Sequence, residues 1–179
     1  MKQIELNDKI FEILLSASEI DQINEKLAAQ INTAYKAKDP IILSVLDGSF
    51  MFCADLIRKF DFPHLFRFVK ISSYAGMEST GQISMETNLD LDLRGHDVLI
   101  IEDIVDTGRT MSYFVEYLKG KGAENIKVCT LLFKPEAVQT KLSLDFVGIE
   151  IKNEFVLGYG LDWDYRGRHY PEIYQLKKE

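Results

Sequence analysis

VLIIEDIVDTGRTM, residues 98–111, carries the clearest structural signal in the chain. Its first four residues are apolar and predict a buried strand, and the run from Asp106 to Thr110 opens a predicted helix. In open α/β sheets, ligands bind at the carboxyl ends of the strands, and the free N–H groups of a helix N-terminus favour phosphate. We therefore predict an anion-binding turn between this strand and this helix.

The side chains around this turn suit a phosphorylated sugar. Gly108 lets the backbone approach an anion closely, and Thr107 and Thr110 add hydroxyl donors. Glu102 and Asp103 suit ribose hydroxyls or Mg²⁺, which prefers oxygen ligands and keeps several waters. A lone Asp-Thr-Gly would more simply be a helix cap beside a solvated turn. Two acids after a buried strand, followed by that turn and a helix, favour a binding site.

Strand-like and helix-like segments alternate along the rest of the chain, which predicts a parallel sheet with right-handed crossovers. Ser18 is a candidate N-cap for the first helix, with Asp21 three residues later. The last 25 residues, rich in aromatic and polar side chains, would cap the edge of the sheet. We expect strands over residues 41–46, 65–71, 97–101, 126–133 and 146–151, and helices over residues 18–37, 50–59 and 109–119.

Composition narrows the class of protein. Hydrophobic residues make up 46% of the 179, no apolar run approaches the roughly 20 residues that cross a bilayer, and the N-terminus does not resemble a signal peptide. The net charge of −7 disfavours nucleic-acid binding, which depends on Lys and Arg neutralising phosphates. Cys53 and Cys129 stand in apolar surroundings, which predicts buried thiols and a cytoplasmic location.

Residues 98–111 resemble the signature of the type I phosphoribosyltransferases: an apolar strand, two acids, two apolar residues, Asp-Thr-Gly and a closing Thr. Four further segments resemble the hypoxanthine-guanine members of that family, in the right order. They are VLDGSFMFCADL (45–56), SSYAGMESTG (72–81), LLFKPEA (131–137) and the segment 145–171. The second of these begins a period-free loop, 72–84, of a length more typical of a lid than of a connector.

The resemblance implies a type I phosphoribosyltransferase fold: a central, mainly parallel sheet flanked by helices, a hood to which residues 152–179 contribute, and a mobile loop, all in one domain over 1–179. It implies purine salvage, in which Mg²⁺-dependent transfer from phosphoribosyl pyrophosphate to hypoxanthine or guanine gives IMP or GMP and pyrophosphate. It also implies a homodimer or homotetramer that acts on small molecules, with neither nucleic acid nor membrane as partner.

The resemblance also assigns roles to the residues of the signature. Glu102 and Asp103 would hold the ribose hydroxyls with Mg²⁺ beside them. The phosphate would be bound by the turn, Asp106, Thr107, Gly108, Arg109 and Thr110. Asp106 would also be the general base at purine N7, since a base must lie within hydrogen-bond reach of its proton.

Other matched positions would bind the purine and close the site. Lys134 would donate to the oxygen on purine C6, Phe155 would stack on the base, and the Val156 main chain would read its edge. Asp162 would bind a second Mg²⁺. Ser73 and Tyr74 would form a lid that excludes water.

Pyrophosphate would be bound by Gly48, Ser49 and Arg168, with Arg166 the competitor for the arginine's role. The chain departs from the family at Asp47, where a basic residue is common. A carboxylate there would not pair with pyrophosphate oxygens, so any role for its side chain is limited to a metal-bound water. The family often has a cis peptide at this point.

Three alternatives remain open on sequence grounds. A phosphoribosyltransferase for xanthine or a pyrimidine would share the signature. An RNA-binding regulator on the same fold should show a basic face, yet 21 Lys and Arg stand against 28 acids. A Mg²⁺-binding receiver-like domain would use Glu102-Asp103 as its acidic pocket, but it leaves the run from Thr107 to Thr110 unexplained.

Overall fold

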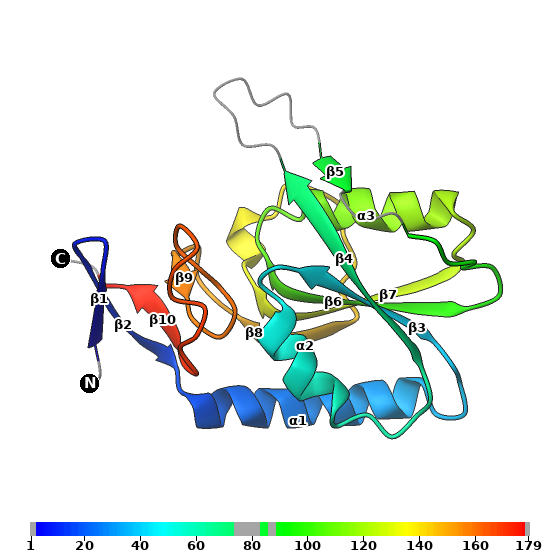
Figure 1. Ribbon diagram of the computed structural model, residues 1–179, viewed down its shortest axis with the longest axis horizontal. Coiled ribbons are helices and arrows are strands. Elements are labelled where there is room, and N and C mark those ends of the chain that lie inside the picture. The colour runs from blue at the N-terminus through cyan, green and yellow to red at the C-terminus, as the bar shows by residue number, and fades with distance from the viewer. Residues whose placement is uncertain (1–2, 74–82, 86–88, 178–179) are drawn as a thin grey trace.

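The computed structural model describes residues 3–73, 83–85 and 89–177. Six strands among these residues form a central sheet in the order β5-β4-β3-β6-β7-β8, parallel except for β5 (Figure 1). This confirms the predicted α/β fold class. The strands are β3 (Ile41–Leu46), β4 (Leu65–Ser73), β5 (Ile83–Met85), β6 (Asp97–Val105), β7 (Asn125–Phe133) and β8 (Phe146–Glu150).

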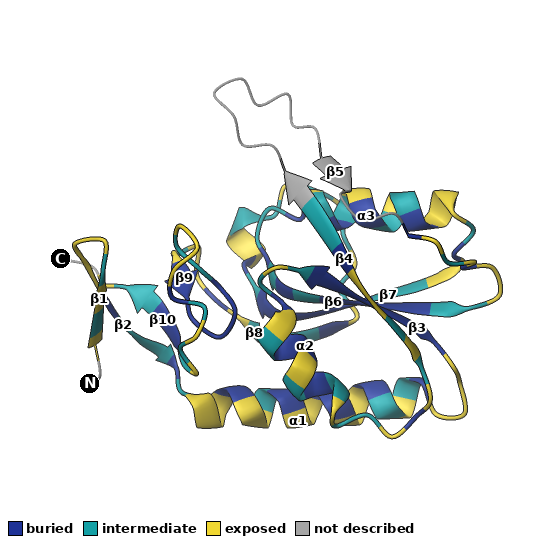
Figure 2. Cartoon of the chain, viewed as in Figure 1, coloured by how far each residue is buried: buried dark blue, intermediate teal, exposed yellow. Residues whose placement is uncertain are grey.

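Helices cover both faces of this sheet, which is why its strands read as nearly continuous apolar runs. α1 (Ala17–Ala34) and α2 (Phe50–Ile57) lie on one face, and α3 (Arg109–Gly120) lies on the other (Figure 1). In β6, Leu99 and Ile101 pack into the core cluster of α1 and α2, whereas Val98 and Ile100 pack into the cluster of α3. Figure 2 shows the resulting buried sheet and the exposed outer side of α1.

A second, four-stranded sheet forms the hood, in the order β1-β2-β10-β9 and antiparallel throughout. Its strands come from both ends of the described chain: β1 (Gln3–Leu6), β2 (Lys9–Leu15), β9 (Val156–Leu157) and β10 (Ile173–Leu176). Phe11, Leu157 and Tyr174 form its fully or almost fully buried core. The sequence interpretation had placed only the C-terminal segment here and had assigned no strand to residues 3–15.

Two local predictions are wrong. α1 is capped by Ser16, not Ser18: the Ser16 hydroxyl accepts from the Glu19 N–H, and the Glu19 carboxylate accepts from the Ser16 N–H, a complete capping box. β6 runs on to Val105, four residues past the predicted end, because β7 continues to pair with it at Ile104 and Val105. Glu102 and Asp103 therefore lie within the strand.

The other predicted elements agree with the structure to within a few residues, and a 3₁₀ turn, Pro135–Ala137, follows β7. β5, β9 and β10 were not predicted, and the predicted loop 72–84 gives its first two residues to β4 and its last two to β5. No helix in the described part of the chain is long and apolar enough to cross a membrane.

β3 and β6 are parallel neighbours at the centre of the sheet, so their carboxyl ends lie side by side. The residues predicted for the phosphate turn and the pyrophosphate loop follow these two strand ends.

Candidate active site

A cavity of about 240 Å³ opens at the carboxyl ends of β3 and β6. Its wall carries the predicted phosphate turn on one side and the predicted pyrophosphate loop on the other. It is lined by Val45, Leu46, Asp47, Gly48, Ile71, Glu102, Ile104, Val105, Asp106, Thr107, Gly108, Thr110 and Met111. The structure therefore brings most of the signature to one pocket, with exposed Arg109 just outside its lining.

The phosphate turn is shaped by Gly108, which caps α3 with φ +76°, a left-handed conformation that favours glycine. Any side chain here would also crowd the Thr140 hydroxyl, 2.7 Å from the position of a Cβ atom. The loop after β7 contacts this turn, because the Gln139 N–H donates to the Thr107 carbonyl at 3.0 Å. Sequence reasoning missed this supporting loop, which has no motif of its own.

The acidic pair lies near the carboxyl end of β6, where Asp103 is buried and the partly buried Glu102 lines the cavity. Burial raises the pKa of Glu102 well above its usual range, and the negative charge of Asp103 acts in the same direction. Burial also raises the pKa of Asp103, against the opposing effect of hydrogen bonds and of the Arg168 charge. The Glu102 Oε2 atom is buried and has no hydrogen-bond partner in the described structure. A buried, unpartnered carboxylate oxygen is suited to accept from a ligand hydroxyl or bind a cation.

Glu102 and Asp103 suit a divalent cation that keeps several of its waters better than a cation fully enclosed by protein ligands. In residues 3–73, 83–85 and 89–177, no three His, Cys, Asp or Glu side chains are grouped to hold a metal. The predicted trio of Glu102, Asp103 and Asp162 is thus not one cluster in this structure. Mg²⁺ usually binds through one or two carboxylates and completes its shell with water and substrate oxygens, which Glu102 and Asp103 allow.

Asp106 and Lys134 form an ion pair across the pocket edge. Lys134 Nζ lies 2.7 Å from Asp106 Oδ2, and the Lys134 side chain is only 8% exposed. The Lys134 N–H also donates to the Val105 carbonyl, so the backbone around both side chains is held together. The candidate base and the candidate purine-reading lysine are therefore direct neighbours, which their separation in sequence did not reveal.

The pyrophosphate loop runs from the end of β3 into α2, and its Leu46–Asp47 peptide bond is cis. Gly48 lies against the Asp103 carboxylate so closely that a Cβ atom would overlap it. Ser49 is fully buried, and its hydroxyl contacts Ser44 Oγ and donates to the Val45 carbonyl. Any contact from Ser49 to pyrophosphate would therefore come from its backbone, not its side chain.

Arg168 and Asp162 pair with each other beside this loop. Arg168 Nη2 lies 2.8 Å from Asp162 Oδ1, and Arg168 Nη1 donates to the Gly160 carbonyl. The other Asp162 oxygen accepts from the Tyr165 N–H. Arg166, the competitor, is exposed, and the described structure pairs only its backbone, with Trp163. The geometry favours Arg168.

Several predicted residues lie outside the cavity lining, namely Ser49, Asp103, Arg109, Lys134, Phe155, Val156, Asp162 and Arg168. Phe155 is 44% exposed, with its ring 5.5 Å from the Trp163 ring, and Val156 is buried in β9. Ser73 ends β4, and Tyr74 lies outside the described residues, as does most of the predicted lid loop.

A parallel sheet with an anion-binding turn, buried acids and a facing Gly-Ser loop defines a phosphoribosyltransferase-type site. A family model described as "Phosphoribosyl transferase domain" matches residues 12–164, and the chain belongs to this family. The chain is 39% identical to a hypoxanthine-guanine phosphoribosyltransferase of Aquifex aeolicus over 97% of its own length and 98% of that protein.

Two further similar proteins carry names of the same kind. A Listeria monocytogenes protein named "Bifunctional protein TilS/HprT" is 37% identical over 97% of this chain, which spans only 27% of that longer protein. The crystal structure of a hypoxanthine phosphoribosyltransferase from Staphylococcus aureus superimposes with a TM-score of 0.87 at 38% identity, covering 93% of this chain and 91% of that one. These findings confirm the predicted family and fold.

Proposed function

We propose that the chain salvages purines by transferring the 5-phosphoribosyl group from phosphoribosyl pyrophosphate to hypoxanthine or guanine. The observation that carries this assignment is the cavity that the phosphate turn lines together with Glu102 and with Asp47 and Gly48 of the pyrophosphate loop, with the Asp106–Lys134 pair at its edge. Two proteins named for this activity support it, because their similarity to this chain covers 98% of one sequence and 91% of the other structure.

In the proposed reaction, purine N9 bonds to C1 of the ribose while the bond from C1 to the pyrophosphate oxygen breaks. The backbone N–H groups and hydroxyls of the turn hold the 5-phosphate, and Glu102 and Asp103 hold the ribose hydroxyls. Asp106 accepts the proton that leaves purine N7. Gly48 and Ser49 bind pyrophosphate through backbone groups, and Arg168 binds it through its guanidinium. Ser73 and Tyr74 exclude water.

We assign the selection of a 6-oxopurine over adenine to Lys134. Its ammonium group has three donors, of which Asp106 engages one in the described structure, so another is free to donate to an oxygen on purine C6. Adenine carries an amino group there, which would face the ammonium as a second donor. Phe155 offers a partly exposed ring for stacking, and the Val156 main chain meets the base edge.

We propose Mg²⁺ as the cofactor, held near Glu102 and Asp103 and, through water, near Asp162. When bound, it neutralises charge on the leaving pyrophosphate. Chelation with EDTA should abolish turnover and excess Mg²⁺ should restore it, while the thermal unfolding transition stays in place because the metal is not part of the fold. Full activity in EDTA would refute the metal requirement.

We also propose one catalytic domain over residues 1–179, assembled as a homodimer or homotetramer in the cytoplasm. The two free, buried thiols, Cys53 and Cys129, suit a reducing compartment. Sedimentation analysis tests the assembly, and a monomer at all concentrations would contradict it.

The test of the function is pyrophosphate release from phosphoribosyl pyrophosphate with Mg²⁺ and, separately, hypoxanthine, guanine, xanthine, adenine and uracil. Release with hypoxanthine or guanine is the expected outcome. Release with uracil alone, or with no base tested, would overturn the proposal.

A further inference from the structure

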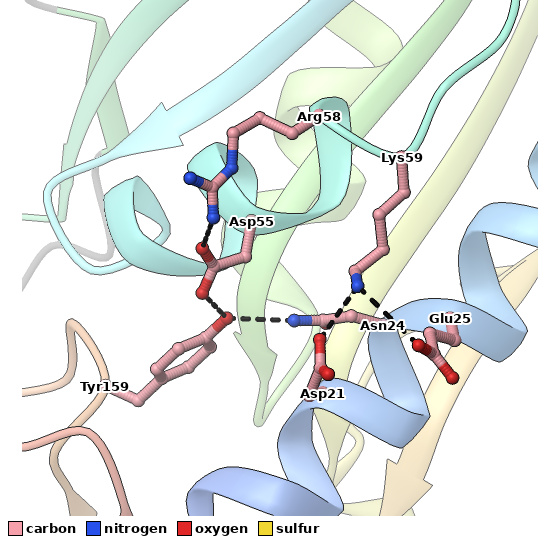
Figure 3. Close-up of polar contacts among 7 residues, drawn as sticks. All are labelled: Asp21, Asn24, Glu25, Asp55, Arg58, Lys59 and Tyr159. Atoms are coloured by element: carbon pink, nitrogen blue, oxygen red, sulfur yellow. Dashed lines mark hydrogen bonds and ion pairs between the residues drawn. The ribbon is translucent and has the colours of Figure 1, made fainter.

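A buried tyrosine links the hood to both helices on one face of the sheet. The Tyr159 hydroxyl accepts from Asn24 Nδ2 of α1 at 2.9 Å and donates to Asp55 Oδ2 of α2 at 2.7 Å (Figure 3). Tyr159 is 4% exposed and Asn24 is 1% exposed. The other Asp55 oxygen accepts from Arg58, so the acceptor is itself held in place.

The residue after this tyrosine lies against the pyrophosphate loop. Gly160 has φ +99°, and a Cβ atom there would overlap the Gly48 carbonyl oxygen. The two backbones are therefore in direct contact. α2, which carries Asp55, begins at Phe50, immediately after the same loop. Tyr159 thus ties the Gly160 turn to the helix that continues the loop it touches.

The same turn carries the predicted pyrophosphate arginine. The Gly160 N–H donates to the Arg168 carbonyl, and the Arg168 side chain donates back to the Gly160 carbonyl. Tyr159 N–H donates to the Tyr170 carbonyl, which closes the segment between them. The position of Arg168 relative to Gly48 therefore depends on where the Gly160 turn is held.

We propose that Tyr159 is a positioning residue for the pyrophosphate half of the site. Its hydroxyl, bridged between Asn24 and Asp55, holds the Gly160 turn and Arg168 in register with the loop at Gly48. The phosphate turn at Asp106–Thr110 and the purine-reading Lys134 lie on β6, α3 and the end of β7, none of which supplies a partner to the Tyr159 hydroxyl. The inference rests on the proposed function, because it assigns Arg168 to pyrophosphate.

The test compares Tyr159→Phe with Tyr174→Phe in the full-length protein. Tyr174 is also buried in the hood and also uses its hydroxyl, which donates to Glu172 at 3.2 Å, so its loss controls for a general weakening of the hood. For each variant, calorimetry measures the affinity for inorganic pyrophosphate with Mg²⁺ and, separately, for GMP. Steady-state kinetics give KM for phosphoribosyl pyrophosphate and kcat.

Tyr159→Phe should weaken pyrophosphate binding and raise KM for phosphoribosyl pyrophosphate about 3- to 10-fold, the range that loss of one or two hydrogen bonds gives. GMP affinity should change less than twofold, and Tyr174→Phe should change neither ligand. Asp55→Ala should reproduce the pyrophosphate effect, and the double variant should be no worse than either single one, because both remove the same bridge.

Equal loss of pyrophosphate and GMP affinity in Tyr159→Phe would overturn the proposal, since it would show a merely structural role. So would an effect in Tyr174→Phe of the same size, or no effect in Tyr159→Phe. If the wild-type protein binds pyrophosphate but turns over neither hypoxanthine nor guanine, the proposed function fails. A selective loss of pyrophosphate binding in Tyr159→Phe would then still uphold the positioning role.

Discussion

Asp106 is the residue to which we assign two roles, binding of the 5-phosphate within the turn and acceptance of the proton from purine N7. It lies in the phosphate turn at the N-terminal side of α3, and its carboxylate is 2.7 Å from the ammonium of Lys134. An ion pair fixes the direction of the carboxylate before any substrate arrives. Because Lys134 is almost fully buried, its charge needs this partner, and removal of the Asp106 carboxylate would leave a buried charge unpaired.

Replacing Asp106 by Asn tests the assignment of the base. Asparagine keeps an oxygen that accepts from Lys134 but does not take a proton from purine N7, so kcat should fall about 10²- to 10⁴-fold. Stopped-time assays of nucleotide formation measure this, and circular dichroism checks the fold. The exposed Asp164→Asn serves as control and should keep the wild-type rate. An unchanged rate in Asp106→Asn would remove Asp106 from the role of base.

Lys134→Ala tests the reading of the purine. The ratio of kcat/KM for hypoxanthine to that for adenine should fall by about 10- to 100-fold, because a buried donor to the C6 oxygen is lost. Lys141→Ala, an exposed lysine on the loop that follows, is the matched control. Selectivity that survives in Lys134→Ala would show that another group recognises the C6 position.

At the scale of elements, the beginning of α1 shows how local signals compete. Ser16 and Ser18 both precede apolar residues at helical spacing, and each has an acid three residues later, Glu19 and Asp21 respectively. The structure selects Ser16, because β2 ends at Leu15 and the chain enters the helix directly from that strand. The pairing of β2 therefore decided between two serines that are equivalent as N-caps in the sequence. The helical spacing of apolar residues contains no information about that pairing.

Ser16→Ala should therefore lower the free energy of unfolding by about 1 kcal/mol, as loss of an N-cap side chain commonly does. Ser18→Ala, within the first turn, should stay within about 0.5 kcal/mol of the wild type, as an exposed substitution away from such features does. Urea denaturation followed by circular dichroism separates the two. Equal losses would contradict the assignment of Ser16 rather than Ser18 as the N-cap of α1.

At the scale of the whole molecule, charge separates a small-molecule enzyme from a nucleic-acid binder. The chain carries 28 acids against 21 Lys and Arg, for a net charge of −7. The groups proposed to bind anions are instead local: backbone N–H groups at one helix terminus and Arg168 beside the pyrophosphate loop. Such a set suits one phosphorylated ligand rather than a polyanion.

The protein should consequently pass through an immobilised-RNA column at about 50 mM salt without retention. It offers few Lys and Arg side chains to neutralise RNA phosphates and so release the counterions condensed on the RNA. Elution in the flow-through is measured by absorbance and activity. Retention that weakens steeply with added salt would indicate a nucleic-acid-binding surface. It would then favour the alternative that the chain is an RNA-binding regulator on the same fold.

The features that could be predicted without the structure are those whose residues are contiguous in the chain. An apolar strand, two acids and a Gly-containing turn before a helix identify the phosphate side of the site, because strand, turn and helix signals act over a few residues. The alternation of such segments likewise predicted the parallel sheet. These features need no knowledge of distant parts of the chain.

Contacts between segments far apart in the chain became known from the folded structure alone. The hood joins β2 to β10, with Gln175 donating to Glu12 over 163 residues, and Asn24 meets Tyr159 over 135. Lys134 meets Asp106 over 28. Strand propensity depends on the partner strand and the surface it covers, so residues 3–15 carry no strand signal strong enough alone. Pairing across such distances is set by the packing of the whole chain, not by local preference.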